Sequence, residues 1–304
     1  MTVIAPTEFK ETSGREDIRG KSINKILEYS FENWTDFVDT AENHTMKVSH
    51  DKYSYRASRK QDHQDFNNFG SFESAIYAAR YGWPEGLARI KKEIDNLGGI
   101  LPVKEFRKTL EYSIAGPGTV DMGRYLVGHP ECVVTWRDRE EDVYGNGPIV
   151  AITCNLGASW DVTPETLFRR GALIVALVDL LESSDRRCEI TILASHARNG
   201  HDLRWKTIIK HAHDPLDLER VAFALASGDC YRRLGFSVVE GASEEFREKC
   251  GIHPGGGYGS VGEWDLPDTL NIPPANDKTS WSSEYTRIRW LKAELLKQGV
   301  DWET

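Results

Sequence analysis

One segment of the chain, residues 149–194, constrains the fold more than any other. Ile149–Cys154 is a continuous apolar run, which is typical of a strand buried on both faces of a sheet. A short turn follows, and Thr163 then precedes a long apolar helix that has Pro164 at its first position. A second apolar run, Cys188–Ala194, predicts the next strand. This order of strand, helix and strand predicts a crossover between two parallel strands.

The segments after this unit predict further α/β structure. We expect a polar turn at Ser195–Asp202, a strand at Leu203–His213, a helix that begins near Asp214, and a short strand at Phe236–Val239. The predicted fold class is therefore α/β, with a mostly parallel, Rossmann-like sheet flanked by helices and preceded by a helical N-terminal region.

The N-terminal part carries helix signals of its own. Apolar residues at helical spacing predict one helix over 21–43, and Ser71 and Pro84 are placed to begin two more helices. The predicted organisation is a loose N-terminus at 1–20, a helical region at 21–112 with a polar loop at 44–70, an α/β domain at 113–250, and an irregular Gly/Pro-rich segment with a C-terminal helix at 251–304.

Charge and cysteine usage exclude several classes of protein. The 304-residue chain has a formal net charge of −9 and no basic block, which argues against duplex nucleic acid as a partner. No two of the five cysteines are spaced as a metal or redox pair, so we expect a reducing, cytosolic environment. No apolar run is long enough to span a membrane, and the first residues lack the pattern of a signal peptide.

The turn after the first strand is the first candidate site. In an open parallel sheet, ligands bind beyond the carboxyl ends of the strands, and we expect the loops at 155–162, 195–202 and 240–243 to share that edge. A partner protein would dock there. The predicted partner-binding residues are Asn155, Gly157, Ser159, Trp160 and Glu240.

The residues of this turn resemble the von Willebrand factor A-like fold. That family has a strand, an Asp-x-Ser-x-Ser turn and a long buried helix, and the turn holds a divalent cation. By this resemblance, Asn155 takes the place of the Asp, Gly157 that of the first Ser and Ser159 that of the second, while Val238–Gly241 is similar to a later strand that ends in Asp-Gly. The resemblance implies a site for Mg²⁺ or Zn²⁺ at Asn155, Ser159 and Glu240.

The turn departs from the family's pattern, because Asn155 offers a neutral carbonyl and Gly157 offers no side-chain ligand, whereas a hard cation prefers anionic oxygen. Two other interpretations stay open: a turn that only caps the helix, and an anion site made by the backbone amides at the helix start. The A-like resemblance also implies a partner of its own, an AAA+ ATPase of the MoxR type.

A second resemblance covers more of the chain. The segments Ser71–Ile76, Gly82–Gly86 and Val120–Cys132 are similar to a family of uncharacterised tailed-phage proteins, in the same order along the sequence. This resemblance implies a phage origin and a place in the bacterial host cytosol, and it implies no activity.

Histidines form the alternative site. His211 and His213 are two residues apart on a predicted strand, so their side chains should share a face, and Asp214 follows them. His196 and His201 lie on a nearby predicted loop. This spacing suits zinc or iron ligation and would support a metal-dependent hydrolase. The first hypothesis remains a non-enzymatic protein-interaction module with a degenerate A-like fold.

Overall fold

The computed structural model describes most of the chain. The described residues are 10–16, 22–43, 67–96, 111–114, 119–135, 148–159, 161–183, 186–252, 258, 260–262, 264–275, 281 and 283–298.

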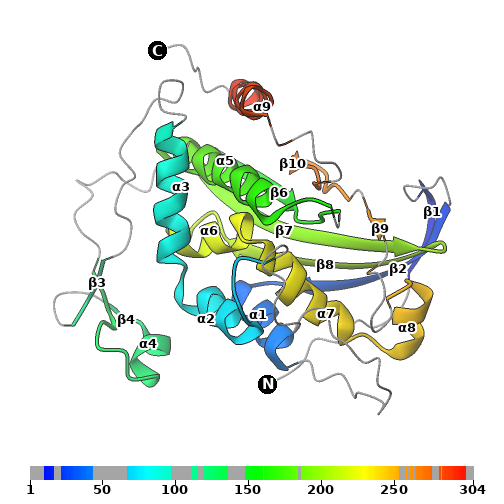
Figure 1. Ribbon diagram of the computed structural model, residues 1–304, viewed down its shortest axis with the longest axis horizontal. Helices are drawn as coiled ribbons and strands as arrows, with labels where there is room; N and C mark the ends of the chain where they lie inside the picture. Colours follow the sequence, from blue (N-terminus) through cyan, green and yellow to red (C-terminus); the bar gives the residue numbers. More distant parts are fainter. Residues whose placement is uncertain are drawn as a thin grey trace.

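The strands form a large mixed sheet and a small separate sheet (Figure 1). The strands are β1 (Lys10–Glu16), β2 (Ser22–Phe31), β3 (Glu111–Ser113), β4 (Thr119–Val120), β5 (Val133–Thr135), β6 (Ile149–Asn155), β7 (Arg187–Arg198), β8 (His201–Lys210), β9 (Ser260–Val261) and β10 (Leu270–Ile272). The large sheet has the order β1-β2-β8-β7-β6-β10, and β9 pairs with β7 beyond the end of β6. The small sheet has the order β3-β5-β4.

Helices flank the large sheet. They are α1 (Trp34–Asn43), α2 (Phe72–Tyr81), α3 (Pro84–Asn96), α4 (Met122–Leu126), α5 (Pro164–Ser183), α6 (Leu218–Ala226), the π-helix η2 (Cys230–Gly235), α7 (Phe236–Glu240), α8 (Glu244–Lys249) and α9 (Glu284–Lys297). In Figure 1, α1, α2 and α7 lie together on one side of the strands β7 and β8. No described helix is both long and apolar enough to cross a membrane.

The predicted crossover is confirmed. Strand β6 pairs in parallel with β7, and α5 connects them. The helix begins where the sequence predicts, because the Thr163 hydroxyl accepts a hydrogen bond from the Thr166 amide at 3.2 Å. The α/β class is confirmed too, since β6 also pairs in parallel with β10, and β2 with β8.

The predicted turn at Ser195–Asp202 is wrong. Strands β7 and β8 run through this segment as an antiparallel hairpin, and the turn consists of Asn199 and Gly200 alone. Both have positive φ, 52° and 74°, which is the geometry of a type I′ turn. Strand β8 ends at Lys210, so His211 and His213 lie after the strand and not on it.

Two further element predictions are wrong. The segment 21–43 is strand β2 followed by helix α1, because β2 pairs along its length with β8 and its side chains Leu27 and Tyr29 are buried in the core. The segment Phe236–Val239 belongs to helix α7, which continues from the π-helix η2. Part of the predicted loose N-terminus, Lys10–Glu16, forms strand β1.

Candidate functional site

The turn after β6 is closed by its own hydrogen bonds. The Asn155 side-chain oxygen accepts from the Gly157 amide at 3.0 Å, and its amide nitrogen donates to the Gly262 carbonyl at 3.0 Å. The side chain of Asn155 is 1% exposed. Its carbonyl oxygen therefore serves the local turn, and its amide ties the turn to a segment more than a hundred residues away.

A distant segment covers the turn. The Ala275 amide donates to the Gly157 carbonyl at 2.8 Å, and the Ser159 amide donates to the Ala275 carbonyl at 3.0 Å. A Cβ at position 157 would overlap Val261 Cγ1, so only glycine allows this close approach. The amides of Gly157 and Ser159 are therefore bonded within the protein, while the anion site at the backbone amides of the helix start stays a prediction.

Two buried arginines also hold the turn. Arg170 on α5 donates to the carbonyls of Asn155 at 2.8 Å and Pro273 at 2.7 Å. Arg232 on η2 donates to the carbonyls of Ser159 at 3.2 Å and Val162 at 2.8 Å, and burial lowers the pKa of its guanidinium to about 10.

The predicted docking edge is thus largely interior. Asn155, Gly157 and Glu240 are buried, and Ser159 is partly exposed. Glu240 lies on helix α7, and its carboxylate accepts a hydrogen bond from the Tyr258 hydroxyl. Trp160 lies outside the described residues. A partner protein that contacts the side chain of Asn155 or Glu240 directly would first have to displace the residues that cover it.

The histidine candidates lie in two places. His211 and His213 stack in the turn after β8 with ring centroids 5.3 Å apart, and Asp214 Oδ1 is 3.4 Å from His213 Nε2. His196 is buried with Nδ1 3.0 Å from the Tyr258 carbonyl, and His201 Nδ1 is 3.0 Å from the Asn199 carbonyl at the hairpin turn. Within the described ranges, no group of three or more His, Cys, Asp or Glu side chains is placed to hold a metal ion.

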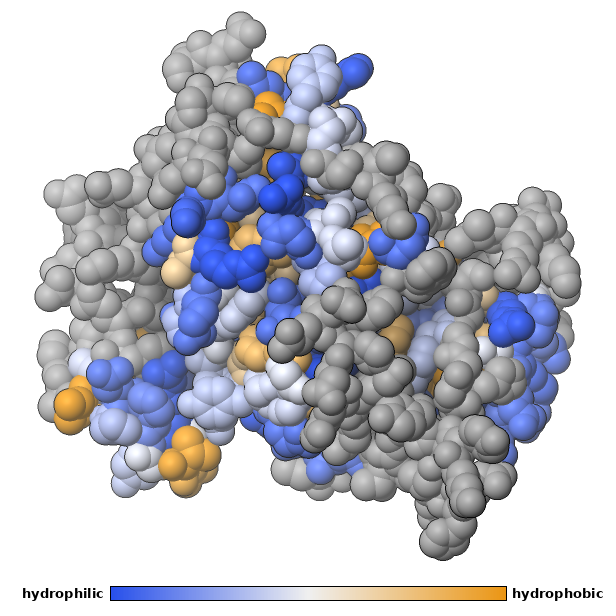
Figure 2. Space-filling view, viewed as in Figure 1, coloured by the Kyte–Doolittle hydropathy of each residue, from blue (hydrophilic) through white to orange (hydrophobic). Residues whose placement is uncertain are grey.

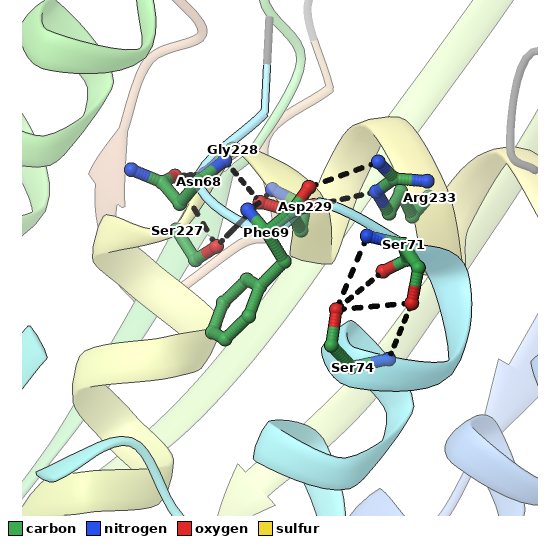
Figure 3. Close-up of polar contacts among 8 residues, drawn as sticks. All are labelled: Asn68, Phe69, Ser71, Ser74, Ser227, Gly228, Asp229 and Arg233. Atoms are coloured by element: carbon green, nitrogen blue, oxygen red, sulfur yellow. Dashed lines mark hydrogen bonds and ion pairs between the residues drawn. The ribbon is translucent and has the colours of Figure 1, made fainter. Parts of the chain in front are cut away.

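A buried charge network that sequence reasoning missed lies where η2 begins (Figure 3). The Asp229 carboxylate accepts from Arg233 Nε at 2.7 Å and from the amides of Asn68 at 2.6 Å and Phe69 at 3.2 Å. Arg233 also donates to the Phe69 carbonyl at 3.0 Å. The signal in the sequence is an Asp and an Arg at i and i+4, which share one side of a helical segment.

This network serves the fold. Burial raises the pKa of the Asp229 carboxyl, and the Asn68 amide and the Arg233 guanidinium oppose that rise. The contacts hold residues 67–71, where Ser71 caps α2, against the start of η2 (Figure 3). Both oxygens of the carboxylate are engaged by the protein itself, which gives the network a structural explanation.

The small sheet and α4 form the most unusual surface. Of the ten exposed large apolar side chains in the described residues, six belong to this unit, and we call them the α4 patch: Ile114, Val120, Met122, Tyr125, Leu126 and Val127. They are between 43% and 76% exposed. No side chain of residues 113–134 whose burial is described is buried.

The unit projects from the rest of the molecule. Figure 1 shows β3, β4 and α4 apart from the large sheet, and Figure 2 shows separate apolar spots among hydrophilic residues in the same part of this face. One described link to the body is a hydrogen bond of 3.4 Å from Arg124 to the Tyr81 carbonyl at the end of α2. The signal in the sequence is the run of consecutive apolar residues at the end of α4, in which apolar and polar positions do not alternate.

Comparison with known proteins gives a family for almost the whole chain. Residues 9–293 match the family described as Domain of unknown function (DUF7192). No curated protein and no solved structure matches the chain. Because the match spans the large sheet, the small sheet and most of α9, the chain belongs to the DUF7192 family.

Proposed function

We propose that this chain is a non-enzymatic protein-interaction module, and that its partner docks on the α4 patch. One observation carries the proposal: the unit of β3, β4, β5 and α4 exposes six large apolar side chains, and none of its side chains described for burial is buried. Exposed apolar patches with this density mark interaction sites in soluble proteins.

The energetics of the unit favour a partner. Full burial of one large apolar side chain is worth about 1.5–3 kcal/mol, and the α4 patch has six of them. A sheet made of strands of two or three residues, in which none of the side chains described for burial is buried, is marginal by itself. A protein that covers the patch would therefore stabilise the folded unit, and the burial of these side chains would contribute to the affinity of the complex.

The interior supports a degenerate A-like fold as part of this proposal. Strand β6, its turn and the long helix α5 stand in the A-like order, and Asn155 occupies the position of the family's carboxylate. Its side chain is used to tie the turn to Gly157 and Gly262, which favours a structural role for the turn over cation binding. We propose a phage-encoded module of the bacterial host cytosol, with a MoxR-type AAA+ ATPase as the partner to test first.

Site-specific crosslinking tests the proposal. A photo-reactive amino acid would replace Tyr125 in one variant and Tyr285, another exposed tyrosine, on α9, in the other. Both variants would be irradiated in the cells that naturally make the chain, and the crosslinked species identified by mass spectrometry. We expect one discrete protein from position 125 and none from 285. Equal yields from both positions, or no discrete species from 125, would contradict the proposal.

A further inference from the structure

The tip of the β7–β8 hairpin places a reactive pair of groups in solvent. Asn199 and Gly200 form the two-residue turn, and Asn199 is exposed. Among the residues that the structure describes, neither the Asn199 carboxamide nor the Gly200 amide forms a hydrogen bond. Gly200 also has no side chain that would crowd its own nitrogen. The turn therefore presents a carboxamide and the peptide nitrogen that follows it, and these two groups can react with each other.

Asparagines in other described segments are held differently. The carboxamides of Asn155 and Asn271 donate to backbone carbonyls at 3.0 and 2.8 Å. Each also precedes a branched apolar residue, Leu156 and Ile272, whose side chain crowds the next peptide nitrogen. The other Asn-Gly pair of the sequence, Asn146–Gly147, lies outside the described residues. Both its free groups and its glycine neighbour set the asparagine of the hairpin tip apart.

The His201 imidazole contacts the peptide bond between Asn199 and Gly200. Its Nδ1 lies 3.0 Å from the Asn199 carbonyl oxygen, and Nδ1 is the donor because a carbonyl only accepts. This hydrogen bond draws electron density away from the peptide group, which makes the Gly200 N–H a stronger acid. His201 follows Gly200 directly, so the contact moves with the peptide when Asn199 rotates about its Cα–C bond.

We infer that Asn199 is a site of spontaneous deamidation, assisted by His201. The Gly200 nitrogen gives up its proton and attacks Asn199 Cγ. An N–Cγ bond forms, the Cγ–Nδ2 bond breaks, and Nδ2 leaves as ammonia with that proton, which gives a cyclic succinimide. Water, the only co-reactant, then adds to one of the two ring carbonyls and opens the ring to aspartate or isoaspartate.

The folded turn controls how often the attack occurs. In a type I′ turn the ψ of the first central residue is about +30°, which keeps the next peptide nitrogen out of reach of Cγ. Ring closure therefore needs rotation about the Asn199 Cα–C bond, and the terminal pair of Arg198 and His201 must separate. Pairs nearer the core keep their contacts during such a local opening. The reaction thus proceeds from an opened hairpin tip and does not require unfolding.

The products change the end of the hairpin. Isoaspartate adds one carbon atom to the main chain, so the two-residue turn no longer matches the pairing of Arg198 with His201. Both products also add a negative charge at the tip. The next pair joins Ala197 to Asp202, whose carboxylate holds Ser195. Deamidation therefore weakens the end of the hairpin that carries this buried carboxylate.

Peptide mapping of the purified full chain tests the inference. The protein would be incubated at body temperature and at neutral and mildly alkaline pH, and mass spectrometry would follow the replacement of NH₂ by OH in each asparagine peptide. We expect Asn199 to deamidate at least ~10-fold faster than Asn155 and Asn271, because its carboxamide is exposed and its turn opens locally. The rate should rise with pH, and urea should raise it further because the turn then stays open.

Variants separate the chemical role of His201 from a structural one. We expect His201→Phe to slow the reaction about threefold, in line with the loss of one hydrogen bond to the reacting peptide. His201→Gln keeps an N–H donor and should restore part of the rate. A histidine that only held the turn closed would have the opposite effect, since its loss would open the turn and speed the reaction. His213→Phe, at an exposed position outside the hairpin, is the control and should leave the rate unchanged.

Two results would overturn the site: Asn199 that stays intact while Asn146 deamidates, or equal rates at Asn199, Asn155 and Asn271. A faster reaction in His201→Phe would overturn the assistance by His201. Asn199→Gln should abolish the mass change in this peptide, because attack on the longer side chain closes a larger ring much more slowly. A mass change that persists in Asn199→Gln would assign the reaction to another residue.

Discussion

His196 is a buried imidazole among aromatic rings. It stacks on Tyr231 with centroids 5.6 Å apart, meets Phe236 edge-on, and its Nδ1 lies 3.0 Å from the Tyr258 carbonyl. Its Nε2 is buried and has no hydrogen-bond partner among the residues that the structure describes. Because burial disfavours the charged form, the pKa of His196 is lowered from 6.5 to about 4.

This environment predicts acid sensitivity. The pKa of His196 in the folded chain lies below its value in the unfolded chain, so protonation favours the unfolded chain. The contribution of neutral His196 to the free energy of unfolding is therefore complete above pH 6.5 and is lost as the pH falls toward 4. The loss should reach about 3 kcal/mol near pH 4. Urea unfolding between pH 7 and 4 would measure it. His196→Gln should flatten the dependence and exposed His213→Gln should not; an unchanged slope in His196→Gln would refute the assignment.

The Asp229–Arg233 pair makes a second prediction at the residue scale. Asp229→Ala leaves a guanidinium that is 1% exposed without its partner, together with the amides of Asn68 and Phe69. Removing one member of a buried pair costs about 3–5 kcal/mol of stability. Chemical denaturation should show this loss, with Asp229→Asn intermediate. Glu245→Ala, which breaks the exposed pair with Lys249, is the control and should leave the midpoint unchanged.

Among the elements, the hairpin of β7 and β8 contributes most to the sheet. Because the turn has two residues, strand pairing begins directly at Arg198 and His201. The pairing register shifts between Ile190 and Thr191. The pairing places Ser195 opposite Arg204. Both side chains donate to the Asp202 carboxylate, the Ser195 hydroxyl at 2.6 Å and Arg204 Nε at 2.5 Å. Sequence reasoning assigned this segment to a loop, although Asn-Gly between two apolar runs is a strong hairpin signal.

The turn's backbone predicts the effect of a substitution. Gly200 has a φ of 74°, a region that β-branched residues avoid, so Gly200→Val should destabilise the fold by about 1–2 kcal/mol. Gly70→Ala is the matched control, because an added Cβ there meets nothing within 4 Å and should change stability by less than about 0.5 kcal/mol. Thermal unfolding of the two variants provides the comparison, and equal melting temperatures would contradict the turn assignment.

At the scale of the whole molecule, residues 261–275 close the large sheet over the turn after β6. Strand β10 adds to β6 in parallel, Trp264 packs over the Arg204 guanidinium, and Ala275 bonds to Gly157 and Ser159. Arg170 connects β6 to the segment after β10, because its guanidinium donates to the carbonyls of Asn155 and Pro273. The same guanidinium lies against the face of the Trp281 ring.

Hydrogen exchange can test this closure. Arg170→Met leaves the buried Asn155 carbonyl and the partly exposed Pro273 carbonyl without this donor; the buried carbonyl alone costs about 1–3 kcal/mol, which corresponds to at least about fivefold faster local opening. We expect the amides of Ser159 and Ala275 to exchange faster while those of α2 and α3 keep their rates. Arg169→Met replaces the neighbouring exposed arginine and is the control. Equal protection of Ala275 in both variants would show that Arg170 does not hold the segment.

Local signals were sufficient for several elements. Ser71 and Ser74 form a capping box at the start of α2, Pro84 begins α3, and Thr163 caps α5, as the sequence predicts. These features act within a single helical turn, so neighbouring residues alone specify them. The apolar run of β6 was equally clear, because burial on both faces requires such a run.

Long-range contacts decided the rest. The segment before α1 became a strand because β8 offers a parallel partner 176 residues later in the chain (201 − 25), and Thr207 also bonds to the Asn33 carbonyl. Pairing and burial of this kind override a weak helical periodicity. Similarly, η2 and α7 continue one helical segment in which Phe236 stacks on Tyr258 from a distant part of the chain.

The sequence by itself determined the α/β class, the crossover from β6 through α5 to β7 and the helix caps, because each depends on an apolar run or on residues a few positions apart. Only the tertiary structure decided which surfaces are available. Segments distant in sequence cover Asn155 and Glu240, whereas nothing described covers the α4 patch. The physical reason is that exposure depends on which segments meet in space, and a turn's own residues do not specify what will lie over them.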